Sequence, residues 1–136
     1  MITISTDKKK LQIPVIHQFL TNCYWAKGRT IKDVEKSIKH SLCFGVYFDG
    51  AQIGFARIAT DYTIFAYLMD VFILQEYRGK GYSKQLIEAI HTNAELQSCK
   101  VWMLKTADAH GLYKQFEYTD LSHPEKVMER LLKKKQ

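Results

Sequence analysis

A short basic and glycine-rich segment, Arg78 to Gly81, has residue types and spacing that suit phosphate chemistry. It follows an apolar run from Tyr67 to Leu74, which is typical of a strand, and precedes a pattern typical of a helix. Glycines lack Cβ atoms, so their N–H groups can approach a ligand closely and their φ angles can be positive. A helix that begins there directs unpaired N–H groups and the positive end of its dipole at the ligand. The segment therefore predicts a pyrophosphate-binding turn.

Other glycine-rich phosphate motifs do not fit this turn. The Gly-x-x-x-x-Gly-Lys-Ser/Thr pattern of a P-loop is absent. A dinucleotide-binding fingerprint would place Gly or Ala at Lys84 and would lie in the first strand–helix turn, not after a meander. A chain of 136 residues is also too short for a kinase with its own glycine loop.

The elements that must position the turn follow from the apolar periodicity. The predicted strands are Ile2–Ser5, Leu42–Phe48, Gln52–Ala59, Ile64–Leu74, Lys100–Leu104 and Glu117–Leu121. The predicted helices are Ile13–Cys23, Ile31–His40 after an N-cap at Thr30, Tyr82–Ile90, Asp108–Phe116 and a last one opened by Pro124. Asp49-Gly50 predicts a hairpin turn between the second and third strands. The order βααβββαβαβ, with a final helix, indicates one domain over residues 1–136. Its class is α/β of the α+β type, with a mixed, mostly antiparallel sheet flanked by helices.

Charge and composition limit the function classes. Part of the net charge of +6 lies in Lys8–Lys10 and Lys133–Lys135, which indicates either solvated tails or nucleic-acid contact. No nucleic-acid motif accompanies the charge, so no nucleic-acid partner is expected. A positive field also raises the association rate of an anionic cofactor.

Targeting and metal signals are weak. The sequence has no run of about 18 apolar residues and no secretory h-region, so neither a membrane span nor a signal peptide is expected. Cys23, Cys43 and Cys99 are odd in number and far apart, which fits the reducing cytosol and argues against disulfides and zinc. We therefore expect a cytoplasmic protein without a metal ion.

Two segments together resemble the GNAT superfamily of acetyl-CoA-dependent N-acetyltransferases. The first, residues 71–83, is similar to the acyl-CoA-binding motif Arg/Gln-x-x-Gly-x-Gly/Ala, with Arg78, Gly81 and Ser83 at its positions. Ser83 departs from the usual Gly or Ala. The second, residues 108–116, resembles the signature Ala-x-x-Leu-Tyr-x-x-x-Gly-Phe, although Glu117 and Tyr118 stand where Gly and Phe are usual. The order of elements and the chain length also match the family.

The resemblance implies acetyl-CoA as cosubstrate and a set of residues that hold it. Backbone groups of Val71 and Ile73 would bind the pantetheine arm like an added strand, in the gap where this strand splays from its neighbour. The amides of residues 78–83 would bind the pyrophosphate. Thr106 stands where many members have an Asn that contacts CoA. The implied cofactor-binding residues are Val71, Phe72, Ile73, Arg78, Gly79, Lys80, Gly81, Tyr82, Ser83 and Thr106.

The resemblance also implies direct attack by a neutral amine on the thioester, with an amide N–H for the oxyanion. Tyr113 matches the family's general acid, and a phenol with an ordinary pKa of about 10 is protonated at neutral pH. The alternative for Tyr113 is packing beside Leu112 and Phe116. Asp70, a charged residue in an apolar run, is either the base or amine anchor, or part of a structural ion pair. Asp61 and Glu76 are weaker candidates for the base.

The acceptor site is expected between the first two helices, because GNAT members usually build it there. Tyr24 and Trp25 would form an aromatic wall that contacts a cation, or would be core residues under a loop. Arg29 belongs to the same segment. His110 would line the cleft, cap a helix or face solvent.

The sequence thus predicts an acetyl-CoA-dependent N-acetyltransferase that acts on a primary amine of a small molecule or peptide. The alternative on the same fold is a non-catalytic acyl-CoA-binding sensor or interaction module. A basic nucleic-acid-binding domain is a third class, and it would show steep salt dependence. A homodimer is expected from the resemblance alone. The amine acceptor and the range of acyl groups are not fixed by the residues.

Overall fold

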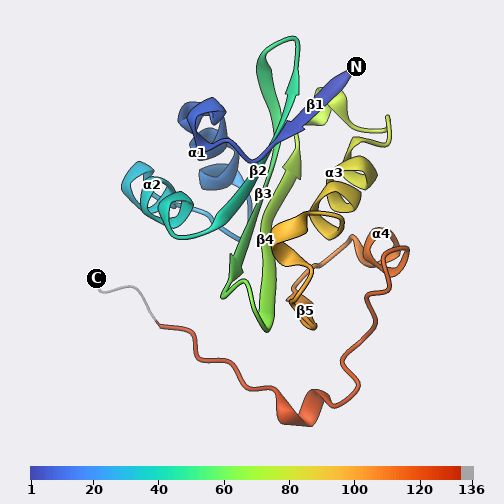
Figure 1. Ribbon diagram of the computed structural model, residues 1–136. Helices are drawn as coiled ribbons and strands as arrows, with labels where there is room; N and C mark the ends of the chain where they lie inside the picture. Colours follow the sequence, from blue (N-terminus) through green and yellow to red (C-terminus); the bar gives the residue numbers. More distant parts are fainter. Residues whose placement is uncertain (133–136) are drawn as a thin grey trace. The chain divides into compact units, whose positions relative to one another are not determined.

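The computed structural model describes residues 1–132 of the chain (Figure 1). The chain forms two compact units, Met1–Thr106 and Ala107–Gln136. Each unit is described here by itself. The expectation of one domain over residues 1–136 stays a prediction.

The first unit is built on a five-stranded sheet of order β1-β2-β3-β4-β5. The strands are β1 (Ile2–Ser5), β2 (Leu42–Phe48), β3 (Ala51–Thr60), β4 (Phe65–Ile73) and β5 (Val101–Leu104). Strands β1 to β4 pair in antiparallel fashion, and β5 pairs in parallel with β4 after a helical crossover. The predicted mixed, mostly antiparallel sheet is confirmed, and five of the six predicted strands are present.

Helices cover both faces of this sheet. Helices α1 (Ile13–Asn22) and α2 (Ile31–Lys39) lie on one face, and α3 (Tyr82–His91) lies on the other (Figure 1). The apolar stripes of α1 and α2 bury four side chains that pack with Phe55 and Phe72 of the sheet. These four are Ile16, Leu20, Val34 and Ile38. Fully burying one such side chain contributes roughly 1.5–3 kcal/mol, so this core fixes α1 and α2 on β3 and β4.

Two local predictions hold in detail. The Thr30 side chain accepts a hydrogen bond from the Asp33 amide at 3.1 Å and so caps α2. Asp49 and Gly50, between β2 and β3, have φ angles of 49° and 82°. Two successive positive φ angles are what a two-residue hairpin turn requires.

The second unit contains less regular structure than the sequence predicts. Helix α4 (His110–Lys114) is present, within the predicted range Asp108–Phe116. The strand predicted over Glu117–Leu121 is wrong. Glu117 has a φ of 71°, in the left-handed region, which breaks an extended strand.

The last predicted helix is also wrong. Pro124–Lys126 forms a single 3₁₀ turn, and Val127 after it is extended. Three apolar residues of that segment, Met128, Leu131 and Leu132, are exposed. A helix this short is marginal without packing of its apolar face, and that packing is missing here. The predicted solvated tail Lys133–Lys135 lies outside the described residues.

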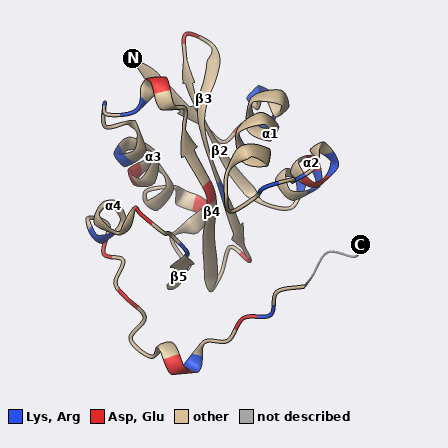
Figure 2. Cartoon of the chain, turned by 180° about the vertical axis from the view of Figure 1, so that it is seen from behind, with Lys and Arg blue, Asp and Glu red and all other residues tan. Residues whose placement is uncertain are grey.

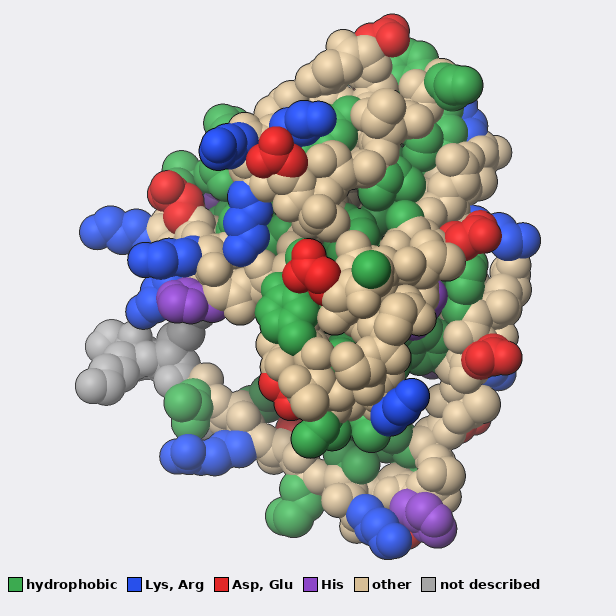
Figure 3. Space-filling view, viewed as in Figure 1, with side chains coloured by type: hydrophobic (Ala, Val, Ile, Leu, Met, Phe, Trp, Pro, Cys, Tyr) green, Lys and Arg blue, Asp and Glu red, His purple; other side chains and the backbone are tan. Residues whose placement is uncertain are grey.

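Charged residues lie mostly on helices and loops, and the sheet is mostly uncharged (Figure 2). The space-filling view shows Lys and Arg side chains gathered over the α1–α2 side of the first unit (Figure 3). The last turn of α2 contains Lys36 and Lys39. Within residues 1–132, no helix is long and apolar enough to span a bilayer.

Candidate active site

The glycine turn lies at the N-terminus of α3. Gly79 and Gly81 have φ angles of 78° and 80°, and Gly81 is the residue before the first helical turn. A side chain would be strained at both positions, whatever the free space. In the described part of the chain, the amides of residues 79–84 donate to no protein acceptor. The turn therefore presents a row of unpaired N–H groups at the positive end of a helix dipole, which suits an anion.

Arg78 differs from the other residues of the turn, because both its amide and its side chain form hydrogen bonds within the protein. Its amide donates to the Gln75 carbonyl at 3.1 Å, and its Nε donates to the Ile73 carbonyl at 2.9 Å. Its amide is therefore already used within the protein. The side chain of Arg78 links the turn to the end of β4.

The second half of β4 has an unpaired edge. The parallel ladder pairs Phe65 with Val101 and ends where Leu68 meets Leu104, whereas β4 continues to Ile73. On the other side, Phe72 pairs with Phe55 of β3. Alternate residues of a strand direct their backbone groups to opposite sides, so those of Val71 and Ile73 face away from β3. This unpaired edge, next to the glycine turn, corresponds to the splay that the family resemblance implies.

Phe72 is a core residue in this arrangement. Its ring stacks on Phe19 of α1 at a centroid distance of 4.0 Å and packs against Phe55. Its side chain is buried, so any contact with a ligand would be made by its backbone.

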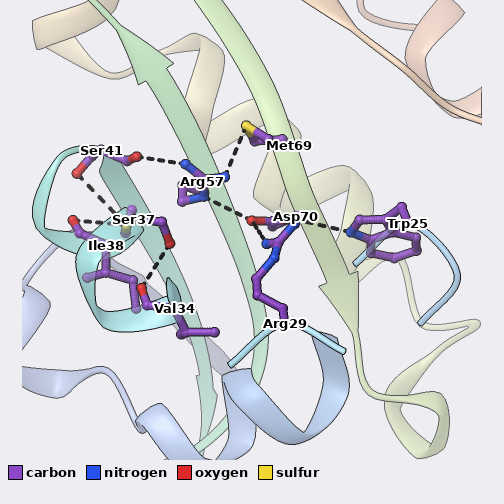
Figure 4. Close-up of polar contacts among 10 residues, drawn as sticks. Trp25, Arg29, Val34, Ser37, Ile38, Ser41, Arg57, Met69 and Asp70 are labelled. Atoms are coloured by element: carbon purple, nitrogen blue, oxygen red, sulfur yellow. Dashed lines mark hydrogen bonds and ion pairs between the residues drawn. The ribbon is translucent and has the colours of Figure 1, made fainter. Parts of the chain in front are cut away.

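Asp70 is the centre of a buried polar cluster (Figure 4). Its side chain is only 1% exposed. Oδ2 accepts from Arg29 Nη1 at 2.6 Å and from Arg57 Nε at 2.9 Å. Oδ1 accepts from Trp25 Nε1 at 3.2 Å. The ion pair that the sequence left open as one alternative is therefore present.

The local fold explains this cluster. The Asp70 side chain meets Trp25 and Arg29 of the segment between α1 and α2, and Phe72, two residues further along β4, packs against the same two helices. The φ angle of Asp70 is 55°, at an irregularity in the β3–β4 register beside Arg57. Such bulges redirect a side chain. A carboxylate buried there needs charged partners, because an unpaired buried charge is very costly.

Arg57 is a residue that sequence reasoning missed. It lies on β3, where Nη1 donates to Ser41 Oγ at 3.0 Å and Nη2 to Met69 Sδ at 3.2 Å. The signal that could have found it is the same one that drew attention to Asp70. Both are single charges in otherwise apolar strands, and two such charges of opposite sign on neighbouring strands predict a pair.

The segment between α1 and α2 supplies the remaining predicted acceptor residues. Tyr24 is 68% and Trp25 43% exposed, and their rings meet edge to face at 5.2 Å. Figure 4 shows Trp25 and Arg29 reaching Asp70 from this segment, while Arg57 reaches it from β3. The exposure of both rings fits an aromatic wall better than core residues under a loop.

The other predicted site residues lie at the end of the first unit and in the second. Thr106 is half-buried at the end of the first unit, and His110 is exposed at the start of α4. Tyr113 of α4 is buried beside the Tyr118 ring at 5.7 Å. Burial raises the pKa of the Tyr113 hydroxyl to about 12, and the nearby Asp108 carboxylate adds to this shift. Among the described residues, no group of His, Cys, Asp and Glu gathers as metal ligands.

The splayed strand and the glycine turn suit an acyl-CoA ligand, and the comparisons with known proteins define the acetyltransferase class and its family. The family model described as Acetyltransferase (GNAT) domain matches residues 39–120, more than half of the chain. The chain therefore belongs to the GNAT acetyltransferase family, whose members transfer acetyl groups and use acetyl-CoA. The matched range contains both segments that carried the resemblance.

Similar proteins agree with this assignment. A GNAT-family protein from Xanthomonas campestris pv. campestris, solved by crystallography, is 44% identical. It covers 97% of this chain and 94% of its own, with a TM-score of 0.95. A candidate acetyltransferase of Gibberella zeae is 28% identical over 79% of this chain and 73% of its own length. A Clostridium acetobutylicum protein, solved with acetyl-CoA, is 14% identical, with coverage of 96% of each chain and a TM-score of 0.69. That last likeness shows the fold alone.

Proposed function

We propose that this protein transfers the acetyl group of acetyl-CoA to a primary amine of a small molecule or peptide, by direct attack of the amine. Membership of the GNAT family supports acetyl transfer in general. The observation that carries the proposal for this chain is the row of unpaired amides at residues 79–84, beside the unpaired edge of β4.

These residues fit acetyl-CoA, whose thioester supplies the acetyl group. The amides of Gly79 to Ser83 bind the pyrophosphate, and the Lys80 and Lys84 side chains add positive charge. Backbone groups of Val71 and the Ile73 amide extend the sheet along the pantetheine arm. The Ile73 carbonyl accepts from Arg78, so we assign the carbonyl contacts of the arm to Val71.

Tyr113 donates a proton to the thiolate that leaves. Its raised pKa of about 12 keeps the hydroxyl protonated at neutral pH and well above it. A general acid must hold its proton until the step that uses it, and a phenol with this pKa does so. Positioned proton donors of this kind contribute about 10²- to 10⁴-fold in rate.

Asp70 enters the proposal in one of two ways. It takes the amine proton, or it fixes the segment that holds the amine. The contacts favour the second role, since its oxygens already accept from three donors and its side chain is 1% exposed. The base role stays a prediction, tested by the pH–rate profile of Asp70→Asn. An unchanged acidic limb would count against it.

The test of the proposed function is CoA release from acetyl-CoA with and without a panel of amines, with Tyr113→Phe as the central variant. We expect turnover to fall by about 10²- to 10⁴-fold while acetyl-CoA affinity, measured by calorimetry, is largely kept. Tyr118→Phe is the matched control, because it removes a hydroxyl from the neighbouring ring. Full activity of Tyr113→Phe would remove Tyr113 from the mechanism.

The alternative, an acyl-CoA-binding sensor or interaction module, predicts a different result. Acetyl-CoA would then bind to the wild-type protein, and no amine would be acetylated.

A further inference from the structure

The buried cluster at Asp70 has more positive than negative charge. Two guanidinium groups, Arg29 and Arg57, share one carboxylate, and their side chains are only 19% and 12% exposed. One positive charge is therefore left without a protein partner in a site that water reaches poorly. Charges in such places are usually paired.

The surplus charge belongs to Arg29. Arg57 uses all three of its nitrogens, on Asp70, Ser41 and Met69. Arg29 donates only from Nη1. Within residues 1–132, its Nε and Nη2 have no partner, although a guanidinium carries five N–H donors in a fork that fits a carboxylate with two parallel hydrogen bonds.

No nearby acidic side chain neutralises Arg29 from its own segment. Residues 23–30 contain Lys27 and Arg29 but no Asp or Glu. Near Arg57, Asp33 and Lys36 line an open surface hollow of about 360 Å³. Their charges are opposite in sign, so together they add no net charge. The surplus positive charge at Arg29 therefore persists.

The place of Arg29 connects this charge to the reaction. Its partner Asp70 directly precedes Val71, whose backbone faces the unpaired edge of β4. Trp25 shares Asp70 with Arg29 (Figure 4), and the exposed ring of Tyr24 meets the Trp25 ring edge to face. An anion on Arg29 would thus lie beside the expected site of acetyl transfer, next to aromatic faces that attract an ammonium group.

We propose that the acceptor is a small amine that also carries a carboxylate close to its amino group, as an amino acid does, and that Arg29 binds this carboxylate. The inference rests on the proposed acetyl transfer and names its substrate class. Polyamines, which carry only cations, are repelled by the surplus charge at Arg29.

The test compares L-phenylalanine with phenethylamine, which differ in the carboxylate alone. We expect wild-type kcat/KM to favour L-phenylalanine by about 10- to 100-fold, the usual worth of hydrogen bonds to a charged group. In Arg29→Gln this preference disappears, mainly through KM. Arg29→Lys keeps the charge without the fork and retains part of the preference. Lys27→Gln, an exposed cation of the same segment, keeps the full preference.

A binding measurement separates this inference from the proposed function. N-acetyl-L-phenylalanine and N-acetylphenethylamine are titrated into wild type and Arg29→Gln in the presence of CoA. Carboxylate-dependent binding that Arg29→Gln abolishes, without turnover of any amine, would uphold the site and overturn acetyl transfer. Turnover of both amines at equal kcat/KM would uphold acetyl transfer and overturn the site. Neither binding nor turnover would overturn both. If Arg29→Gln does not fold, the wild-type comparison and Arg29→Lys still decide.

Discussion

Asp70 holds together two parts of the first unit. It accepts from Trp25 and Arg29 of the segment before α2, and from Arg57 of β3. Such a cluster is weak evidence for stability as a whole, because burying the three charges is itself costly. Removing one partner, in contrast, destabilises the protein strongly, because the other charges stay buried without compensation.

Asp70→Asn should therefore destabilise the protein strongly. The amide keeps the shape of the side chain but leaves two guanidinium groups, 19% and 12% exposed, without a counter-charge. We expect the free energy of unfolding to fall by about 3–5 kcal/mol, measured by urea unfolding. Asp49→Asn is the control, because Asp49 is an exposed turn residue with a φ of 49° that Asn also tolerates. A loss below about 1 kcal/mol, the worth of an exposed pair, would mean that the cluster is solvated.

The sequence singled out three of the four residues of the cluster, Trp25, Arg29 and Asp70, but not the contacts between them. Asp70 was found because a charge in an apolar strand needs a partner or a role. Its partners could not be chosen, since Arg29 is 41 residues away and Arg57 is 13 residues away. The β3–β4 register is irregular beside Arg57, and the sequence does not predict this register, which brings Arg57 to Asp70. Likewise, only the folded structure shows that Nε and Nη2 of Arg29 have no partner within residues 1–132.

The strand β4 and the helix α3 form the element pair that the proposed function needs. The turn between them depends on positive φ angles at Gly79 and Gly81. Because the second of these precedes the first turn of α3, its conformation sets where the unpaired amides point.

Gly81→Ala tests this turn. A Cβ in the left-handed region costs about 1–2 kcal/mol, so the turn must either keep that strain or rotate its amides. We expect the Kd for acetyl-CoA, measured by calorimetry, to rise by at least about 10-fold, the equivalent of 1.4 kcal/mol. Gly50→Ala is matched to it, because Gly50 has a φ of 82° in the β2–β3 hairpin. It should lose similar stability and keep its affinity for acetyl-CoA. Equal affinities of wild type and Gly81→Ala would mean that the turn does not hold the pyrophosphate.

Element prediction succeeded where local chemistry and core packing agree. The bounds of β1 and β2 match their predicted ranges, since alternating or buried apolar runs end there at turn residues. It failed in the second unit, where the apolar residues after Pro124 suggested a helix whose packing is missing.

Glu117 stands at a position whose backbone conformation favours glycine. Its φ of 71° is one that glycine adopts readily, and the family signature has glycine at this position.

The whole chain carries a net charge of +6. Lys and Arg side chains gather over the α1–α2 side of the first unit (Figure 3). This distribution fits an anionic ligand as well as it fits a solvated surface, and sequence alone could not choose between them. Neither the homodimer nor the cytoplasmic location expected from the sequence is tested by the fold.

Salt dependence separates steering of acetyl-CoA from general nucleic-acid binding. The phosphates of acetyl-CoA are anionic, so a positive protein field raises the association rate, and salt screens that field within a Debye length of about 10 Å at 0.1 M. We expect the association rate constant, measured by stopped-flow tryptophan fluorescence, to fall by about 10-fold or more between low and high ionic strength. S-acetylpantetheine, which lacks the phosphates, should show little change. A rate constant for acetyl-CoA that does not respond to salt would exclude steering. Tight, steeply salt-dependent binding to an arbitrary DNA duplex would instead favour a nucleic-acid partner. The positive surface would then be explained by contacts with DNA phosphates and not by acetyl-CoA.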